Sequence, residues 1–290
     1  SETAIRGRFS VVNPNYNYSG NEIRFTAEST KTSKMSAFGY DSSKTGFSLG
    51  TTFEQYEDIF ISPELSTYYE SLSTNDNASD ALKQQEGTYI DTELRYSVIQ
   101  DKRDQSFKPT EGYRASFNQK LPLYSESPSL INGIDYSAYH SFSDNFIGSL
   151  RFHGRAINSL SSSEDVKLSE RLSIPGRYLR GFEVGKIGPV DASDYIGGNY
   201  VTALGFNAAL PKLLPNLTNA DVSLFLDTGN VWGIDYDTNI DESNKLRSAF
   251  GVSVDWFTPI GPLSFSFSEA ITSASTDKPE SFRFNIGTTF

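Results

Sequence analysis

The residue with the clearest potential for chemistry is Asp227, which begins an Asp-Thr-Gly motif after an apolar run. In aspartic proteases, two such aspartates share a proton and activate a water molecule. The chain holds one copy of the motif and does not continue after it as a protease would, so catalysis would need a homodimer. The two histidines, His140 and His153, have no serine or cysteine motif nearby, and we interpret them as lumen or interface residues. The sequence predicts no catalytic residue and no enzyme.

Composition disfavours metal and nucleic-acid binding. The chain has no cysteine and two histidines, so thiolate and histidine-rich metal centres lack ligands. Acidic pairs at Glu164-Asp165 and Asp241-Glu242 would suit calcium or lipopolysaccharide-bridged cations, but solvated loops carry such pairs far more often. The formal net charge of -11 opposes binding to nucleic acid, which needs a basic face. We therefore predict no cofactor, no metal and no nucleic-acid partner.

The segment 173–189 differs from the rest of the chain because it lacks an alternating pattern. It holds four glycines and two prolines, which oppose a regular element. Its apolar side chains are too numerous for a solvated loop, and Arg180 lies among them. We therefore predict a functional loop that packs inside a β structure, with an ordinary surface loop as the alternative. The apolar side chains are Tyr178, Leu179, Phe182, Val184 and Ile187.

Strands are the elements that must position these groups. Through most of the chain one parity is apolar and the other polar, which is the period of a β-strand. The clearest case is 263–267, where Leu and Phe alternate with Ser. No segment keeps a helical period over three turns. The pattern predicts about thirteen strands, near residues 4–12, 21–31, 44–55, 57–72, 87–100, 110–121, 130–142, 144–158, 198–210, 219–230, 245–258, 261–271 and 281–290.

The length of these strands favours a membrane barrel. Many have ten or more residues, whereas strands in globular proteins average about five or six. The mean hydropathy is only -0.41, but barrel strands face lipid at every second residue alone. The polar parity mixes serine, glycine, threonine and both signs of charge, as a wet lumen does. We predict an all-β fold, an antiparallel transmembrane β-barrel; a soluble β-sandwich or β-helix is the alternative.

The last predicted strand carries a possible targeting signal. Phe282, Phe284, Ile286 and the terminal Phe290 share one face of this strand. A chain that ends on an aromatic residue in an alternating strand resembles the sorting signal of bacterial outer-membrane proteins. We therefore predict these four residues to be the C-terminal strand signal.

Five motifs together resemble the C-terminal barrel of the Omp85 superfamily, and most closely its outer-membrane protein assembly factors. They are residues 9–14, 179–182, 197–199, 227–232 and 257–263. The resemblance implies a barrel of about sixteen strands, of which about thirteen are present. It also implies that the first three strands and the periplasmic POTRA domains are missing. We therefore expect residues 1–290 to be one transmembrane barrel domain and a fragment.

The resemblance assigns roles to the 173–189 segment. In the superfamily, the sixth extracellular loop folds back into the lumen, and the arginine of its Arg-Gly-Phe motif binds acidic groups on the wall. Arg180, Gly181 and Phe182 match this motif, and Asp227 matches the wall aspartate. Asp227 also lies on the polar parity of its strand, which points inward. The family's second acidic partner falls near Gly205, where no carboxylate is present, so Asp227 is the main predicted partner.

These observations lead to a functional hypothesis. The resemblance implies a non-enzymatic insertase in the bacterial outer membrane that folds β-barrel proteins into the bilayer. Its expected partners are outer-membrane lipid, unfolded β-barrel substrates and, through the missing POTRA domains, accessory lipoproteins. A secretion translocon of the same superfamily and a passive outer-membrane porin are the alternatives.

Overall fold

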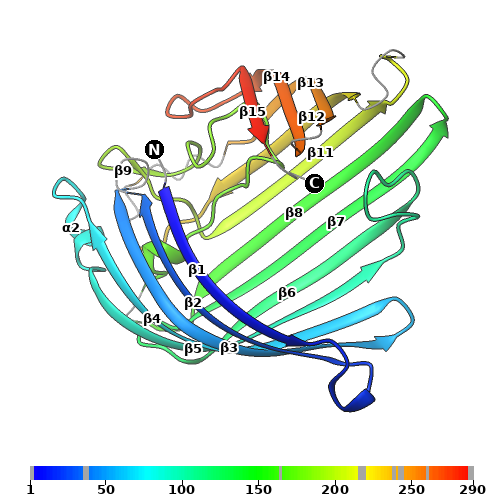
Figure 1. The fold of residues 1–290 in the computed structure, drawn as a ribbon. Helices are drawn as coiled ribbons and strands as arrows, with labels where there is room; N and C mark the ends of the chain where they lie inside the picture. The colour runs from blue at the N-terminus through cyan, green and yellow to red at the C-terminus, as the bar shows by residue number, and fades with distance from the viewer. Residues whose placement is uncertain are drawn as a thin grey trace.

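The computed structural model describes residues 3–34, 39–162, 165–214, 220–236, 240, 245–258 and 261–286. Within these residues, thirteen antiparallel strands form one continuous curved sheet, in which consecutive strands pair with each other and β8 pairs with β11 (Figure 1). The predicted all-β fold and its thirteen strands are confirmed, and the two-sheet sandwich is wrong. The strands are β1 (Thr3–Asn13), β2 (Glu22–Lys34), β3 (Tyr40–Tyr56), β4 (Ile59–Thr74), β5 (Gly87–Asp101), β6 (Gly112–Tyr124), β7 (Ser129–Ser143), β8 (Phe146–Ser159), β11 (Tyr200–Leu210), β12 (Ala220–Trp232), β13 (Arg247–Thr258), β14 (Gly261–Thr272) and β15 (Phe282–Ile286).

The alternation of the sequence produces two different faces of this sheet. Since successive side chains point to opposite faces, residues paired across strands form rows on one face. One outward row is apolar across six strands, and the neighbouring lumen row is polar and buried. The apolar row consists of Val11, Phe25, Leu49, Leu65, Leu94 and Leu121. The polar row contains Thr26, Ser48, Ser66 and Glu93.

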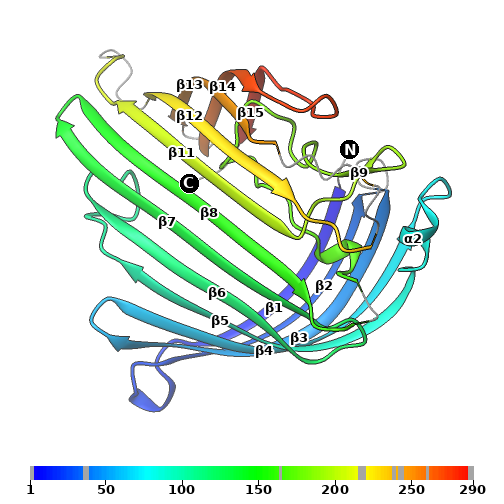
Figure 2. The same cartoon turned by 180° about the vertical axis from the view of Figure 1, so that it is seen from behind.

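Large apolar side chains remain exposed on the outer face along the whole sheet, including Phe9, Ile134, Leu224, Phe250, Phe267 and Phe284. A soluble monomer rarely exposes a continuous apolar surface of this kind. Seen from behind, the long strands β6 to β8 and β11 run side by side and present this face over their full length (Figure 2). The outer face therefore suits lipid, and the inner face suits water and polar contacts.

Short elements that the alternating pattern did not predict lie in the connections. They are η1 (Tyr16–Tyr18), α2 (Asp80–Lys83), η2 (Leu168–Glu170), β9 (Val190–Asp191) and β10 (Asp194–Tyr195), of which the last two pair with each other. None of the helices in the described residues has the length and apolarity that a bilayer crossing requires.

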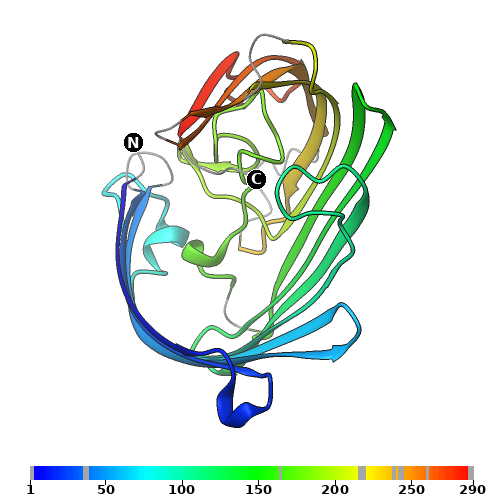
Figure 3. The same ribbon diagram turned by 45° about the vertical axis from the view of Figure 1, so that its right-hand side comes forward.

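The connection between β8 and β11 lies inside the curved sheet. We name its residues 165–199 the lumen loop, and Figure 3 shows it running within the concavity, between the N-terminal and C-terminal strands. At the two ends of the strand order, β1 pairs only with β2 and β15 only with β14 among the described residues. No ladder joins β1 and β15 within this part of the chain.

Candidate functional site

Arg180 of the lumen loop binds the wall of the sheet at Asp227 on β12. The arginine Nε donates to Oδ2 at 2.6 Å, and Nη2 donates to Oδ1 at 2.8 Å. The backbone N–H of Arg180 adds a third bond to Oδ2 at 3.0 Å. The Asp227 side chain is fully buried and that of Arg180 is 13% exposed. The predicted contact is present, with the bidentate geometry of a strong charge-assisted pair.

Two uncharged groups contact Arg180, for which the sequence offered no second carboxylate partner. Asn207 on β11 accepts from Nη2 of Arg180 at 2.7 Å. The Phe225 ring lies under the guanidinium, with 3.6 Å between the ring centroid and the guanidinium carbon, a favourable cation–π distance. Gly205 pairs directly with Asp227 across the strands, and a Cβ there would lie 2.9 Å from Asp227 Oδ1. The site is therefore built around one carboxylate, an amide and a ring.

Gly181 and Phe182 fix the loop next to this pair. Gly181 has a φ of +88°, and a Cβ there would lie 2.5 Å from the Cβ of Ala249, so only glycine fits. Phe182 is 2% exposed and belongs to an apolar cluster between the loop and the wall. Val184 was expected to pack as well, but it is 49% exposed. The cluster consists of Ile174, Leu179, Phe182, Ile187, Val201, Ala203, Val231 and Ala249.

The last strand also holds the lumen loop. Arg283 on β15 donates from Nη1 to the carbonyl of Gly176 at 2.9 Å and from Nη2 to the carbonyl of Phe182. The backbone N–H of Glu280 donates to the carbonyl of Gly181 at 2.9 Å. The loop is thus tied to the edge strand by its backbone. We name all the contacts of residues 174–189 with β11 to β15 the Arg180 anchor.

A second attachment, which we did not predict, holds the start of the lumen loop to the opposite wall. Nζ of Lys167 donates to Asp91 Oδ2 at 2.5 Å and lies 3.4 Å from Glu70 Oε2. All three side chains are at most 6% exposed. We name this group, together with Glu170 and its partners, the Lys167 anchor. These residues are far apart in sequence and belong to no local motif, so no sequence signal marked them.

Glu170 completes the Lys167 anchor. Its carboxylate accepts from Nζ of Lys120 on β6 and from the hydroxyl of Ser129 on β7. Burial alone would raise the pKa of Glu170, but the positive charges of Lys120 and Lys167 and these hydrogen bonds lower it to about 2. The carboxylate is therefore ionised at neutral pH and holds the loop electrostatically.

Both histidines lie beside carboxylates. His153 is buried and its Nδ1 lies 2.7 Å from Asp135, which also accepts from Tyr178 of the loop at 3.1 Å. The rings of His153 and Tyr178 stack at 4.4 Å. His140 is exposed beside Glu111. The Asp227 carboxylate is occupied by Arg180, whereas an aspartic protease needs a second aspartate at that place.

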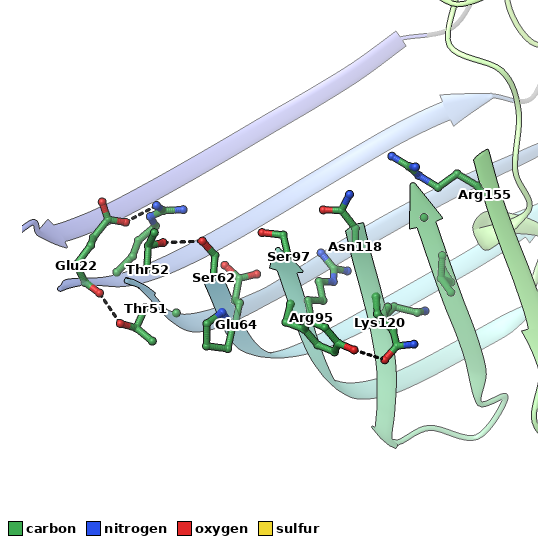
Figure 4. A pocket seen from close by; sticks show the side chains of 17 residues that line it. Glu22, Thr51, Thr52, Ser62, Glu64, Arg95, Ser97, Asn118, Lys120 and Arg155 are labelled. Atoms are coloured by element: carbon green, nitrogen blue, oxygen red, sulfur yellow. Dashed lines mark hydrogen bonds and ion pairs between the residues drawn. The ribbon is translucent and has the colours of Figure 1, made fainter. Parts of the chain in front are cut away.

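The rest of the lumen wall is polar. The inner face of β2 to β8 carries a cavity of about 310 Å³, lined by charged and hydroxyl-bearing side chains (Figure 4). Thr52 and Ser62 bond to each other at 2.9 Å across β3 and β4. Arg24 pairs with Glu22, and Arg155 with Asp135. This wall matches the predicted wet lumen.

The predicted C-terminal strand signal is partly visible. The ring centroids of Phe282 and Phe267 are 5.0 Å apart, and those of Phe284 and Phe265 are 4.9 Å apart, so both pairs pack across β15 and β14. Ile286 is 70% exposed on the outer face. Phe290 lies outside the described residues, as do Glu164, Asp241 and Glu242.

An apolar outer row, a polar lumen and an inward loop held by a buried Arg–Asp pair define a class of protein, the membrane β-barrel with an occupied lumen. Residues 1–290 match the family model described as the Omp85 superfamily domain. The chain therefore belongs to the Omp85 superfamily.

Curated relatives carry the name outer membrane protein assembly factor BamA. The protein of that name from Neorickettsia risticii (strain Illinois) is 26% identical over 220 residues, which cover 74% of this chain and 29% of the relative. That from Neisseria meningitidis serogroup B is 26% identical over 226 residues, 66% of this chain and 28% of the relative. The chain thus spans less than a third of the length of these relatives.

Solved structures show the same fold. BamA from Haemophilus ducreyi lacking POTRA domains 1–3 superimposes with a TM-score of 0.86 at 22% identity, over 97% of this chain and 61% of that one. CdiB from Acinetobacter baumannii gives a TM-score of 0.59 at 12% identity, over 98% of this chain and 50% of that one.

Proposed function

We propose that this barrel lies in the bacterial outer membrane and belongs to an assembly factor that folds β-barrel proteins into the bilayer. The observation that carries the proposal is the attachment of the lumen loop to β15 through Arg283, next to an edge with no partner among the described residues. A strand edge in lipid leaves backbone donors and acceptors unsatisfied, at a cost of several kcal/mol each. An unfolded client strand relieves this cost by pairing with the edge.

The mechanism follows from backbone chemistry alone. A client strand adds to the sheet by β-augmentation, in which main-chain hydrogen bonds supply the affinity and no covalent step occurs. The client then continues hairpin by hairpin in the lipid beside the seam. In this role the barrel acts without an enzymatic reaction or a cofactor, on unfolded barrel proteins and outer-membrane lipid. Accessory lipoproteins would bind to POTRA domains of the full-length protein.

The names of the curated relatives and the likeness to the H. ducreyi barrel support an assembly role over the alternatives. The docked lumen loop argues against a passive porin, because it fills the lumen beside β11 to β14. A secretion translocon of the same superfamily differs in the fate of the client, which it releases across the membrane. The fate of the client therefore separates the two roles.

The test uses the full-length protein in liposomes and a urea-denatured outer-membrane barrel as client. We expect faster client folding than in empty liposomes, read from the mobility shift of folded barrels on unheated gels, and a client that remains in the bilayer. Client recovered in the soluble fraction would favour a translocon. Client folding at the rate of empty liposomes would overturn the proposal.

A further inference from the structure

A cavity of about 530 Å³ lies in the lumen where β6, β7, β8 and β11 face the lumen loop. Among the described residues, five cationic side chains line it, against one carboxylate, that of Asp135. This is unusual in a chain with a formal net charge of -11. The cationic residues are Arg103, Lys108, Arg114, Arg151 and Arg177. We name it the Arg151 cavity.

Arg151 on β8 is the residue whose charge the wall does not satisfy. Its Nε and Nη2 atoms are buried and donate to no acceptor within the described residues. A buried charged donor without a partner is costly, so native structures rarely leave one empty. Across the strands, Arg151 faces Gly205, which offers no side-chain acceptor. The guanidinium lines both this cavity and a neighbouring one of about 650 Å³ that extends toward β15.

Three of the five cationic side chains of the cavity have carboxylate partners nearby. Lys108 pairs with Asp221, and Asp101 binds Arg103 and lies 3.8 Å from Nε of Arg114.

Asp135 is already shared by His153, Arg155 and Tyr178. Arg151 and Arg177 form no ion pair with any described residue. Two guanidinium groups therefore face this cavity without an ion-pair partner among the described residues.

We infer that the Arg151 cavity binds carboxylate side chains of an extended acidic polypeptide segment, as an unfolded client would present it. This inference rests on the proposed function. The volume falls in the range of about 300–1,000 Å³ that is usual for ligand sites. Guanidinium groups bind carboxylates through two parallel hydrogen bonds. Tyr136 and Tyr139, which also line the cavity, offer rings and hydroxyls to an extended chain.

The position of the cavity and the composition of barrel strands favour a polypeptide over other anions. The β5–β6 connection, which supplies Arg103 and Lys108, lies at the end of the sheet opposite α2 (Figure 1). The two-residue turns between β3 and β4 and between β7 and β8 also lie at this end, whereas the long lumen loop starts at the other, so this end would face the periplasm, from which clients would arrive. The strands of this barrel are an example of what a client strand contains: Asp91 and Glu93 occupy alternate lumen positions of β5. Carboxylates at this spacing would follow one another into the cavity.

The test measures binding of a fluorescent peptide of alternating Glu and Thr to the full-length protein in detergent. A peptide of alternating Gln and Thr is the uncharged control. We expect the Gln–Thr peptide to bind at least about tenfold more weakly, and Arg151→Gln to weaken Glu–Thr binding about tenfold, since each loses a charge-assisted hydrogen bond. Arg177→Gln, at an exposed loop residue, tests the same cavity without altering a strand. Arg8→Gln on β1 removes an equal charge elsewhere in the lumen and should leave binding unchanged.

Equal binding of the Glu–Thr peptide to the wild type and to both cavity variants would overturn the inference. So would Arg151-dependent binding of inorganic phosphate without peptide binding, because the cavity would then be a small-anion site. Client folding in liposomes is measured in parallel. If clients fold normally but peptide binding does not depend on Arg151, this inference is wrong and the assembly role stands. If peptide binding depends on Arg151 but clients do not fold, the assembly role is wrong.

Discussion

The two anchors hold one loop to opposite walls by different means. The Arg180 anchor combines a single buried ion pair with an apolar cluster of eight side chains. The Lys167 anchor consists of two lysines and buried carboxylates bound by charge, among hydroxyl groups. An apolar cluster keeps its strength when pH changes, whereas a charge network depends on protonation. We therefore expect the attachment near β4 to β7 to respond to pH more strongly than the apolar cluster near β12.

Breaking the Arg180 anchor should have the largest effect. Arg180→Ala leaves the buried Asp227 carboxylate without its ion-pair partner, although the backbone N–H of residue 180 can still donate to it, and losing one partner of a buried pair costs roughly 3–5 kcal/mol. We expect the folded full-length protein to lose its gel mobility shift at a lower temperature and client folding to slow. Arg6→Ala, which removes an exposed pair with Glu28, is the control and should cost about 0–1 kcal/mol. Equal effects of the two variants would contradict the role of the buried pair, and exchanging the charges of Arg180 and Asp227 should restore part of the loss.

Breaking the Lys167 anchor should cost less. Lys167→Met removes the cation between Glu70 and Asp91, but Glu170 keeps its ion pair with Lys120. We expect a loss of about 2–3 kcal/mol, at or below the low end for a broken buried pair. Hydrogen exchange should rise in residues 165–172 and stay slow in 174–189. A rise throughout the loop would show that the two anchors act as one unit.

Gly181→Ala tests the packing part of the Arg180 anchor, because it adds a methyl group and changes no charge. The added methyl meets Ala249 at 2.5 Å and requires a positive φ, so we expect a loss of about 2 kcal/mol. Gly20→Ala has a similar φ of +78° in open space and isolates the cost of the backbone conformation. Ala249→Gly combined with Gly181→Ala should recover the difference between the two, measured as melting temperature. Identical losses at both glycines would remove the packing argument.

Mild acid should produce the smallest effect, through Glu170 of the Lys167 anchor. The pKa of Glu170 is lowered from 4.5 to about 2 in the folded state. Its contribution to stability is therefore complete above pH 4.5 and is lost as pH falls from 4.5 toward 2. Hydrogen exchange at residues 165–172, corrected for its intrinsic pH dependence, should stay constant from pH 7 to 5 and accelerate below 4.5. Glu170→Gln should reduce this pH dependence, and a transition near neutral pH would contradict the assignment.

The sequence predicted the wall better than the contents of the lumen. Alternation alone located all thirteen strands, because lipid on one side and water on the other impose a period of two on every strand. The Arg180–Asp227 contact followed from a family motif. Asn207 and Phe225 were not foreseen as partners, since an amide or a ring on a strand has no signature of its own. The Lys167 anchor joins residues up to 97 positions apart, which no local pattern can reveal.

The sequence separation of the contact between Arg283 and Gly176 predicts an order of folding. It joins residues 107 positions apart, whereas nearly all ladders of the sheet join strands that follow each other in the chain. Because closing a long segment costs more conformational entropy than forming a hairpin, we expect the wall to form first and the lumen loop to dock last. Before the loop docks, we expect the carboxylates of Asp227 and Glu70 to face water and to be free to bind other cationic groups. In pulse-labelling during refolding, the amide of Glu280 should therefore become protected later than the amides of β12.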